Sequence, residues 1–77
     1  MSRIQSVLFD MKYGWDLESS YTWLENHDMF PIKHADYSKR YISWRILDPL
    51  ECECIRTSKL TNNGIKFRFC FFKGKCY

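Results

Sequence analysis

The sequence predicts a small α+β domain in which one helix packs on a four-stranded, mainly antiparallel sheet, in the order β-α-β-β-β. A chain of 77 residues has room for one domain, so we treat residues 1–77 as a single unit. Segments with strand-like composition lie before and after one segment with helical spacing. Because one helix covers one face of a sheet, the other face is expected to meet solvent or a partner.

The first predicted strand covers residues 4–10 (IQSVLFD), which are rich in β-branched and aromatic side chains. A helix is expected from Asp16 to His27. Asp16 is a typical N-cap, and Glu18 in the first turn complements the helix dipole. Helical spacing predicts an inward apolar stripe of Leu17, Tyr21 and Leu24.

The remaining strands are predicted at residues 31–37 and 40–47, which form a hairpin, and at residues 65–72. The segment between the last two is predicted to be a long connection, with turns at Asp48-Pro49 and Asn63-Gly64. Strand alternation assigns residues to two faces. The inward set is Ile42, Trp44, Ile46, Ile65, Phe67, Phe69 and Phe71, and the outward set is Tyr41, Ser43, Arg45, Lys66, Arg68 and Cys70.

The charge is distributed unevenly along the chain. Residues 1–38 carry three basic and six acidic side chains, a net charge of −3, whereas residues 39–77 carry nine basic and three acidic ones, a net charge of +6. One interpretation is a basic surface for an anionic partner. The other is that the two halves attract each other within the fold.

The four cysteines are Cys52, Cys54, Cys70 and Cys76. Structural zinc sites usually present closely spaced pairs of ligands, and here the second pair is six positions apart. Disulfides are typical of secreted proteins, and no signal-peptide core is visible. Zinc and disulfides stay open as alternatives, but we expect free thiols in a reducing compartment, with Cys70 partly exposed and no metal or other cofactor.

Neither catalysis nor membrane insertion is indicated. His27 falls at the predicted helix end, and His34 has no acid or nucleophile near it in the sequence. There is no phosphate-binding glycine loop and no apolar run long enough to span a bilayer. We therefore expect a non-enzymatic protein with no small-molecule substrate, neither secreted nor transmembrane.

Several short blocks resemble a family of small domains from tailed phages and large DNA viruses. They are the first strand, Trp15, WLENH and PIK, then Y-x-x-W-R-x-x-D-P from Tyr41, R-T-x-K-L from Arg56 and N-G-I-K-F from Asn63. Members occur alone or beside head-maturation proteases, and their function is unsettled. The chain departs from the family at Ser43, where an arginine is usual, in the LECEC segment and in its aromatic ending.

Two non-catalytic functions follow. The resemblance implies a virion-associated structural protein, a minor capsid or capsid-associated component that contacts other virion proteins and is located in the virion or in the host cytoplasm or nucleus. Its predicted interface anchors are Trp15, Trp23 and Phe72. The alternative is a nucleic-acid-binding accessory protein whose sheet face provides Tyr41, Arg45, Arg56, Lys66 and Arg68.

Overall fold

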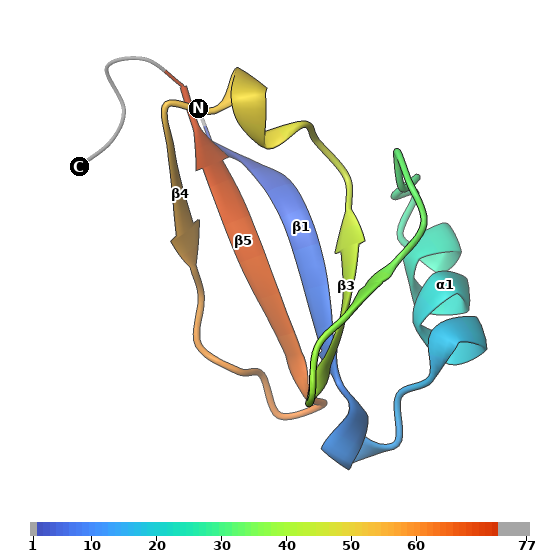
Figure 1. Cartoon of the computed structure of the whole chain (residues 1–77). Coiled ribbons are helices and arrows are strands. Elements are labelled where there is room, and N and C mark those ends of the chain that lie inside the picture. Colours follow the sequence, from blue (N-terminus) through green and yellow to red (C-terminus); the bar gives the residue numbers. More distant parts are fainter. Residues whose placement is uncertain (1, 73–77) are drawn as a thin grey trace.

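In the computed structural model, which describes residues 2–72, one helix packs against an antiparallel sheet of five strands (Figure 1). The helix α1 spans Leu17–Asn26, and two 3-10 helices, η1 (Met11–Tyr13) and η2 (Pro49–Glu51), lie in connections. The prediction of a small single-domain α+β fold with one helix is confirmed. The strands, whose order across the sheet is β2-β3-β1-β5-β4, are β1 (Ser2–Asp10), β2 (Asp36–Tyr37), β3 (Tyr41–Arg45), β4 (Cys54–Thr57) and β5 (Ile65–Phe71).

The sheet has five strands rather than the four predicted. The additional strand is β4, which lies in the segment that the sequence predicts to be a connection. It pairs along the edge of β5, from Cys54 opposite Phe71 to Thr57 opposite Arg68. At the other edge, the strand predicted at residues 31–37 is reduced to the two residues of β2. In both cases long-range pairing, rather than local composition, sets the length of the edge strand.

The helix begins and ends close to the predicted residues. Asp16 is its N-cap, and the Asp16 carboxylate accepts a hydrogen bond of 2.8 Å from the Ser19 backbone N–H. In return, the Asp16 backbone N–H donates to the Ser19 hydroxyl at 3.0 Å, which completes a capping box. His27 is the C-cap. Local capping signals therefore define both ends of α1.

The buried stripe of α1 differs from the predicted one. Leu24 is fully buried as expected, but Leu17 and Tyr21 are 48% and 41% exposed. Ser20, which has no exposed surface, takes their place facing the sheet. Its hydroxyl accepts a hydrogen bond of 2.8 Å from the indole Nε1–H of Trp44. The small side chain lets the helix approach this indole closely.

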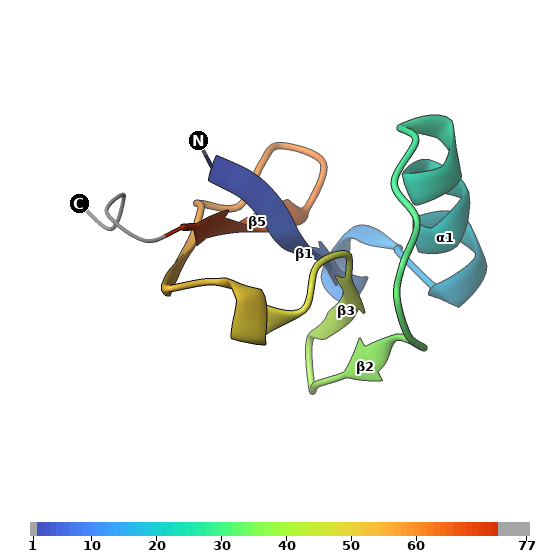
Figure 2. The same ribbon diagram turned by 90° about the horizontal axis from the view of Figure 1, so that it is seen from above.

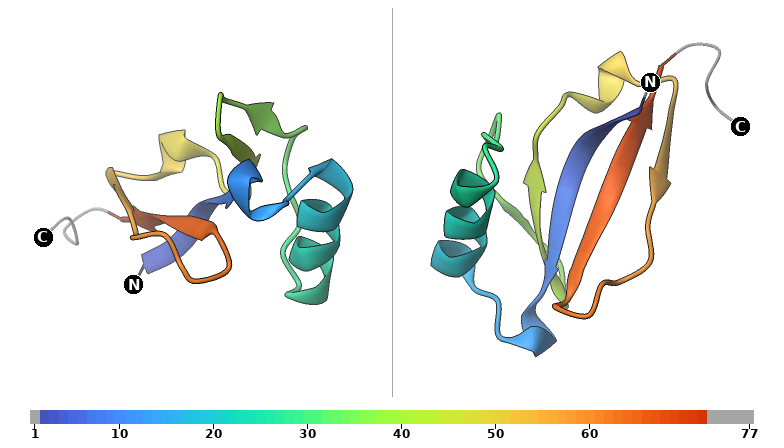
Figure 3. Two further views of the ribbon diagram at one scale, coloured as in Figure 1. Left: turned by 90° about the horizontal axis from the view of Figure 1, so that it is seen from below. Right: turned by 180° about the vertical axis from the view of Figure 1, so that it is seen from behind.

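The core lies between α1 and the central strands. Val7 of β1 is opposite both Trp44 of β3 and Phe67 of β5, so the three side chains share the helix-facing side of the sheet, where Trp44 and Phe67 were predicted. Phe9 packs its ring edge-on against Trp15, with ring centroids 4.9 Å apart. Figure 2 and Figure 3 show α1 on the β3 side of the molecule, away from β4. Phe67 is accordingly only half-buried.

A β-bulge interrupts β1. Ile4 and Val7 both pack toward the core although strand alternation alone would place them on opposite faces. The pairing with β5 shifts between Ile4 and Ser6, so Gln5 is an extra residue. The Gln5 carbonyl accepts hydrogen bonds from the backbone N–H groups of Ile46 and Leu47, at 2.8 and 3.1 Å. The bulge thus keeps Ile4 in the core while Ser6 faces the other side.

Candidate binding site on the open face of the sheet

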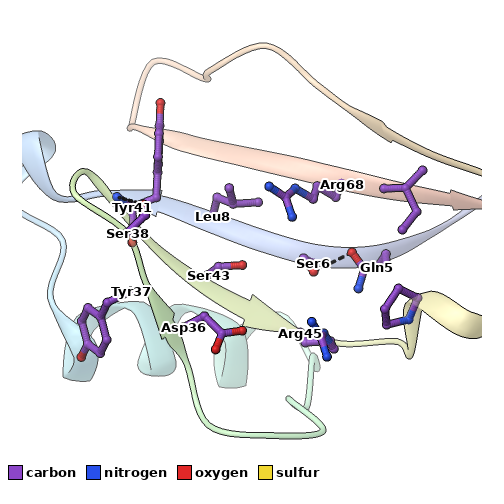
Figure 4. Close-up of a pocket in the computed structure, with 12 residues that line it drawn as sticks. Gln5, Ser6, Leu8, Asp36, Tyr37, Ser38, Tyr41, Ser43, Arg45 and Arg68 are labelled. Carbon is purple, nitrogen blue, oxygen red and sulfur yellow. Dashed lines mark hydrogen bonds between the residues drawn. The ribbon is translucent and has the colours of Figure 1, made fainter.

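The side of the sheet away from α1, hereafter the open face, is concave. Figure 2 shows η2 and β2 on this side and α1 on the other. A depression of about 280 Å³ is lined by residues from all five strands and by Pro49 of η2 (Figure 4). By strand pairing and alternation, the open face comprises Ser6, Leu8 and Asp10 of β1, Tyr41, Ser43 and Arg45 of β3, and Lys66, Arg68 and Cys70 of β5.

Two arginines lie on either side of Ser6 on this face. Ser6 is opposite Arg45 on β3 and opposite Arg68 on β5, so the three residues form one row across the sheet (Figure 4). Arg45 is half-buried and Arg68 is exposed, while Ser6 is 3% exposed. The Ser6 hydroxyl donates a hydrogen bond of 2.7 Å to the side-chain oxygen of Gln5. The floor between the arginines is therefore polar and uncharged.

The other predicted cation, Lys66, lies over an aromatic ring. Its Nζ is 4.9 Å from the centroid of the Tyr41 ring, and the guanidinium carbon of Arg40 is 5.5 Å from the same centroid. Both distances are within the range of cation–π attraction. Tyr41 therefore positions two cations at one end of the open face, and it is less accessible for stacking with a base than the sequence suggested.

Arg40 also neutralises a buried carboxylate. The guanidinium Nη2 of Arg40 lies 2.7 Å from the Oδ2 of Asp10, a side chain with no exposed surface. The Asp10 Oδ1 accepts a hydrogen bond of 2.9 Å from the Lys12 backbone N–H. The hydrogen bond from Arg40 holds the pKa of Asp10 below its ordinary value, although burial acts in the opposite direction. Asp10 therefore forms its ion pair with Arg40 and not with another cation of the open face.

No carboxylate within residues 2–72 lies within ion-pair distance of Arg45, Lys66 or Arg68. Asp36 lines the depression, but its carboxylate pairs with Lys33 at 3.2 Å. The described part of the protein therefore does not neutralise the positive charges of these three residues.

The structure does not bring every predicted residue to this face. Arg56 is opposite Phe69, a helix-side position, and its guanidinium lies 5.8 Å from the Phe71 ring centroid. Arg56 therefore lies on the other side of the sheet from Arg45 and Arg68. Conversely, Arg3 is opposite Cys70, which places an unpredicted arginine at the end of the open face. The sequence could not reveal this position because the bulge at Gln5 reverses the alternation.

The expectation of free thiols is wrong for the described cysteines. Cys52 and Cys70 form a disulfide with Cα atoms 5.3 Å apart, Cys54 is also disulfide-bonded, and no described cysteine is free. Cys70 is on the open face as predicted. It was expected to be partly exposed, but it has no exposed surface and is bonded to Cys52. Cys76 lies outside the described residues. Free thiols were expected because no signal-peptide core is visible, and the disulfide does not fit the reducing compartment expected on the same ground.

Two of the predicted interface anchors contribute to the core. Trp15 is half-buried against Phe9, and its indole Nε1–H donates to the Asn63 carbonyl at 2.7 Å. Trp23 is half-buried between Phe9 and His27, with its ring stacked on the imidazole at 3.8 Å between centroids. Phe72 is half-buried at the end of β5. The packing of both tryptophans inside the domain leaves little of either ring for a partner.

No family model, curated protein or solved structure matches this chain. Among the described residues, no helix has the length and apolar composition needed to cross a membrane.

Proposed function

We propose that this protein is a non-catalytic interaction module that binds nucleic acid through the open face of its sheet. The observation that carries the proposal is that Arg45 and Arg68 line the depression, with Lys66 on the same face of the sheet, and that no described carboxylate neutralises them. Positively charged concave surfaces attract polyanions, and arginine binds phosphate through two parallel hydrogen bonds.

The arrangement favours contacts with the phosphate backbone over base recognition. Tyr41, the aromatic residue among the predicted binding residues, already has Lys66 and Arg40 within cation–π distance of its ring. Backbone contacts carry no sequence information directly, so binding is expected to be independent of sequence and strongly dependent on salt.

The test is to measure fluorescence anisotropy with labelled single-stranded and duplex oligonucleotides of mixed sequences over a range of salt concentrations. We expect binding that weakens steeply with salt and equally for all sequences. Arg68→Glu should weaken it at least tenfold, because the substitution places a negative charge inside the basic face. Arg56→Glu is the matched control, since it makes the same charge change on the other side of the sheet. Equal losses in the two variants, or no binding by the wild-type protein, would contradict the proposal.

A second candidate is a structural role in a virion, through contacts with other virion proteins, which the family resemblance implies. A separate apolar surface favours it: Tyr21, Phe30 and Ile32 are exposed beside Trp44 and Pro31 and line a second depression. Phe30 is 67% exposed, and a contiguous group of exposed apolar side chains is typical of a protein–protein contact surface. If the protein is recovered at fixed stoichiometry from purified particles, and Phe30→Ser removes it while Arg68→Glu does not, this second candidate replaces the first.

A further inference from the structure

We infer that Arg45 and Arg68 hold one phosphate group between them, above Ser6, and that this clamp is the primary contact point for the nucleic-acid backbone. The inference rests on the proposed function and adds a specific subsite with a stated ligand, an oxyanion of the phosphate class. Nothing in the sequence pairs these two arginines, because they lie on strands that are neither consecutive in the chain nor adjacent in the sheet.

The first argument is the row geometry. Arg45 and Arg68 are both directly opposite Ser6, on the two sides of β1. Neighbouring strands lie about 4.8 Å apart, so the two arginine Cα atoms are separated by roughly 10 Å. Two arginine side chains reach across such a gap with a tetrahedral oxyanion between their guanidinium groups. Figure 4 shows both arginines beside Ser6 in the same depression.

The second argument concerns the floor of the row. Ser6 and Gln5 are each 3% exposed, and the Ser6 hydroxyl is engaged by Gln5. The Gln5 amide in turn donates to the Leu47 carbonyl at 3.0 Å. These bonds fix a small polar side chain between the arginines, where a larger one would fill the space. The bulge at Gln5 is what turns Ser6 to this face.

The third argument is electrostatic. Arg45 and Arg68 place two positive charges on either side of Ser6, and the described residues provide no carboxylate to either arginine. Asp36, the acidic residue lining the depression, is paired with Lys33. An anion bound in the row would be attracted by both charges at once, which favours its binding at this position.

The experiment separates one shared phosphate from two independent contacts. Arg45→Gln, Arg68→Gln, the double variant and the off-face control Arg56→Gln are titrated with a single-stranded oligothymidine at several salt concentrations. Each phosphate neutralised on a single strand contributes about 0.7 to the slope of log affinity against log salt. For a shared phosphate, each single variant should nearly keep the slope, whereas the double variant should lose about 0.7. Thermal denaturation confirms that each variant is folded.

Two independent contacts would instead lower the slope by about 0.7 in each single variant and by about 1.4 in the double variant. That result overturns the shared clamp and leaves the proposed function intact. In a parallel experiment, the wild-type protein is titrated with inorganic phosphate, and the arginine Nε–H resonances are recorded by NMR. We expect the signals of Arg45 and Arg68 to shift together and the signal of Arg56 to stay unchanged. If phosphate shifts both signals but no oligonucleotide binds, the proposed function fails and the subsite stands. If phosphate moves neither signal, the subsite is refuted.

Discussion

Asp10 shows how a single residue links the core to the open face. It ends β1, caps η1 through the Lys12 backbone N–H, and pairs with Arg40 while having no exposed surface. Arg40, 44% exposed, reaches on to the Tyr41 ring. One carboxylate therefore stabilises the start of a connection and positions a cation at the edge of the candidate site.

The pH dependence of stability should reflect this carboxylate. Because Arg40 lowers the pKa of Asp10 in the folded state, the stabilisation is complete above the unfolded pKa of about 3.9 and is lost as pH falls through the folded value. Asp10→Asn should therefore be less stable than the wild-type protein at pH 7, and the difference should shrink below about pH 4. Thermal denaturation at a series of pH values measures both effects.

Asp36→Asn is the control for this substitution. Its carboxylate also pairs with a cation, Lys33, but both side chains are exposed. The substitution should therefore change the free energy of unfolding very little at any pH. A pH-independent difference between wild type and Asp10→Asn would show that the residue acts by shape rather than by charge.

Among the elements, β4 depends most on a covalent link. Its four residues are paired to β5, and three of them are exposed. The Cys52–Cys70 disulfide joins the segment just before β4 to the open face of β5, beside Ile55, which is opposite Cys70. The disulfide therefore holds this edge of the sheet, and with it the wall of the depression formed by Pro49 and Ile55.

Replacing both cysteines should loosen this edge. The disulfide closes a loop with a sequence separation of 18, and loop-closure entropy for that length predicts a cost of about 3 kcal/mol for Cys52→Ser with Cys70→Ser. Hydrogen exchange should accelerate at the β4 amides more than at those of β1. Denaturant unfolding measures the cost, and alkylation followed by mass spectrometry, with and without reductant, verifies the bond. An unchanged unfolding midpoint would mean that strand pairing and the disulfide of Cys54 hold β4 without the Cys52–Cys70 bond.

At the scale of the whole molecule, stability is limited by size. Typical domains have roughly 0.05–0.15 kcal/mol of stability per residue, so a chain of this length has on the order of 4–12 kcal/mol. The core is one cluster, centred on Phe9 and Trp44, with no second cluster of buried residues described to support it. The fold therefore depends on a few large side chains.

Trp44→Ala tests this dependence. Trp44 is 6% exposed, packs against Tyr21 and donates to the buried Ser20, so truncation should cost about 3–5 kcal/mol. That is a large part of the total, and the variant should be mostly unfolded at moderate temperature. Tyr37→Ala, at a 60% exposed position, should change stability by less than about 0.5 kcal/mol. Circular dichroism during thermal denaturation distinguishes the two, and similar losses would place the core elsewhere.

The sequence alone determined features that depend on neighbours along the chain. The start of α1 follows from Asp16 and its hydrogen bonds to Ser19, and the turn predicted at Asn63-Gly64 has Gly64 at a φ of 79°, a left-handed conformation that favours glycine. Alternation in β3 and β5 correctly separated Trp44 and Phe67 from Arg45 and Arg68. Capping, turns and alternation are local interactions, and local interactions are encoded in consecutive residues.

The tertiary structure decided which distant segments meet. Placing β1 between β3 and β5 put Ser6 between two arginines, a consequence of strand order that no local pattern reveals. Pairing of β4 with β5 places Arg56 on the helix side of the sheet. It also brings the segment after η2 alongside β5, where Cys52 bonds to Cys70. The bulge at Gln5 lets both the buried Val7 and the partly buried Ile4 pack in one core. Each of these depends on the free energy of packing the whole chain, and that free energy is not a sum of local preferences.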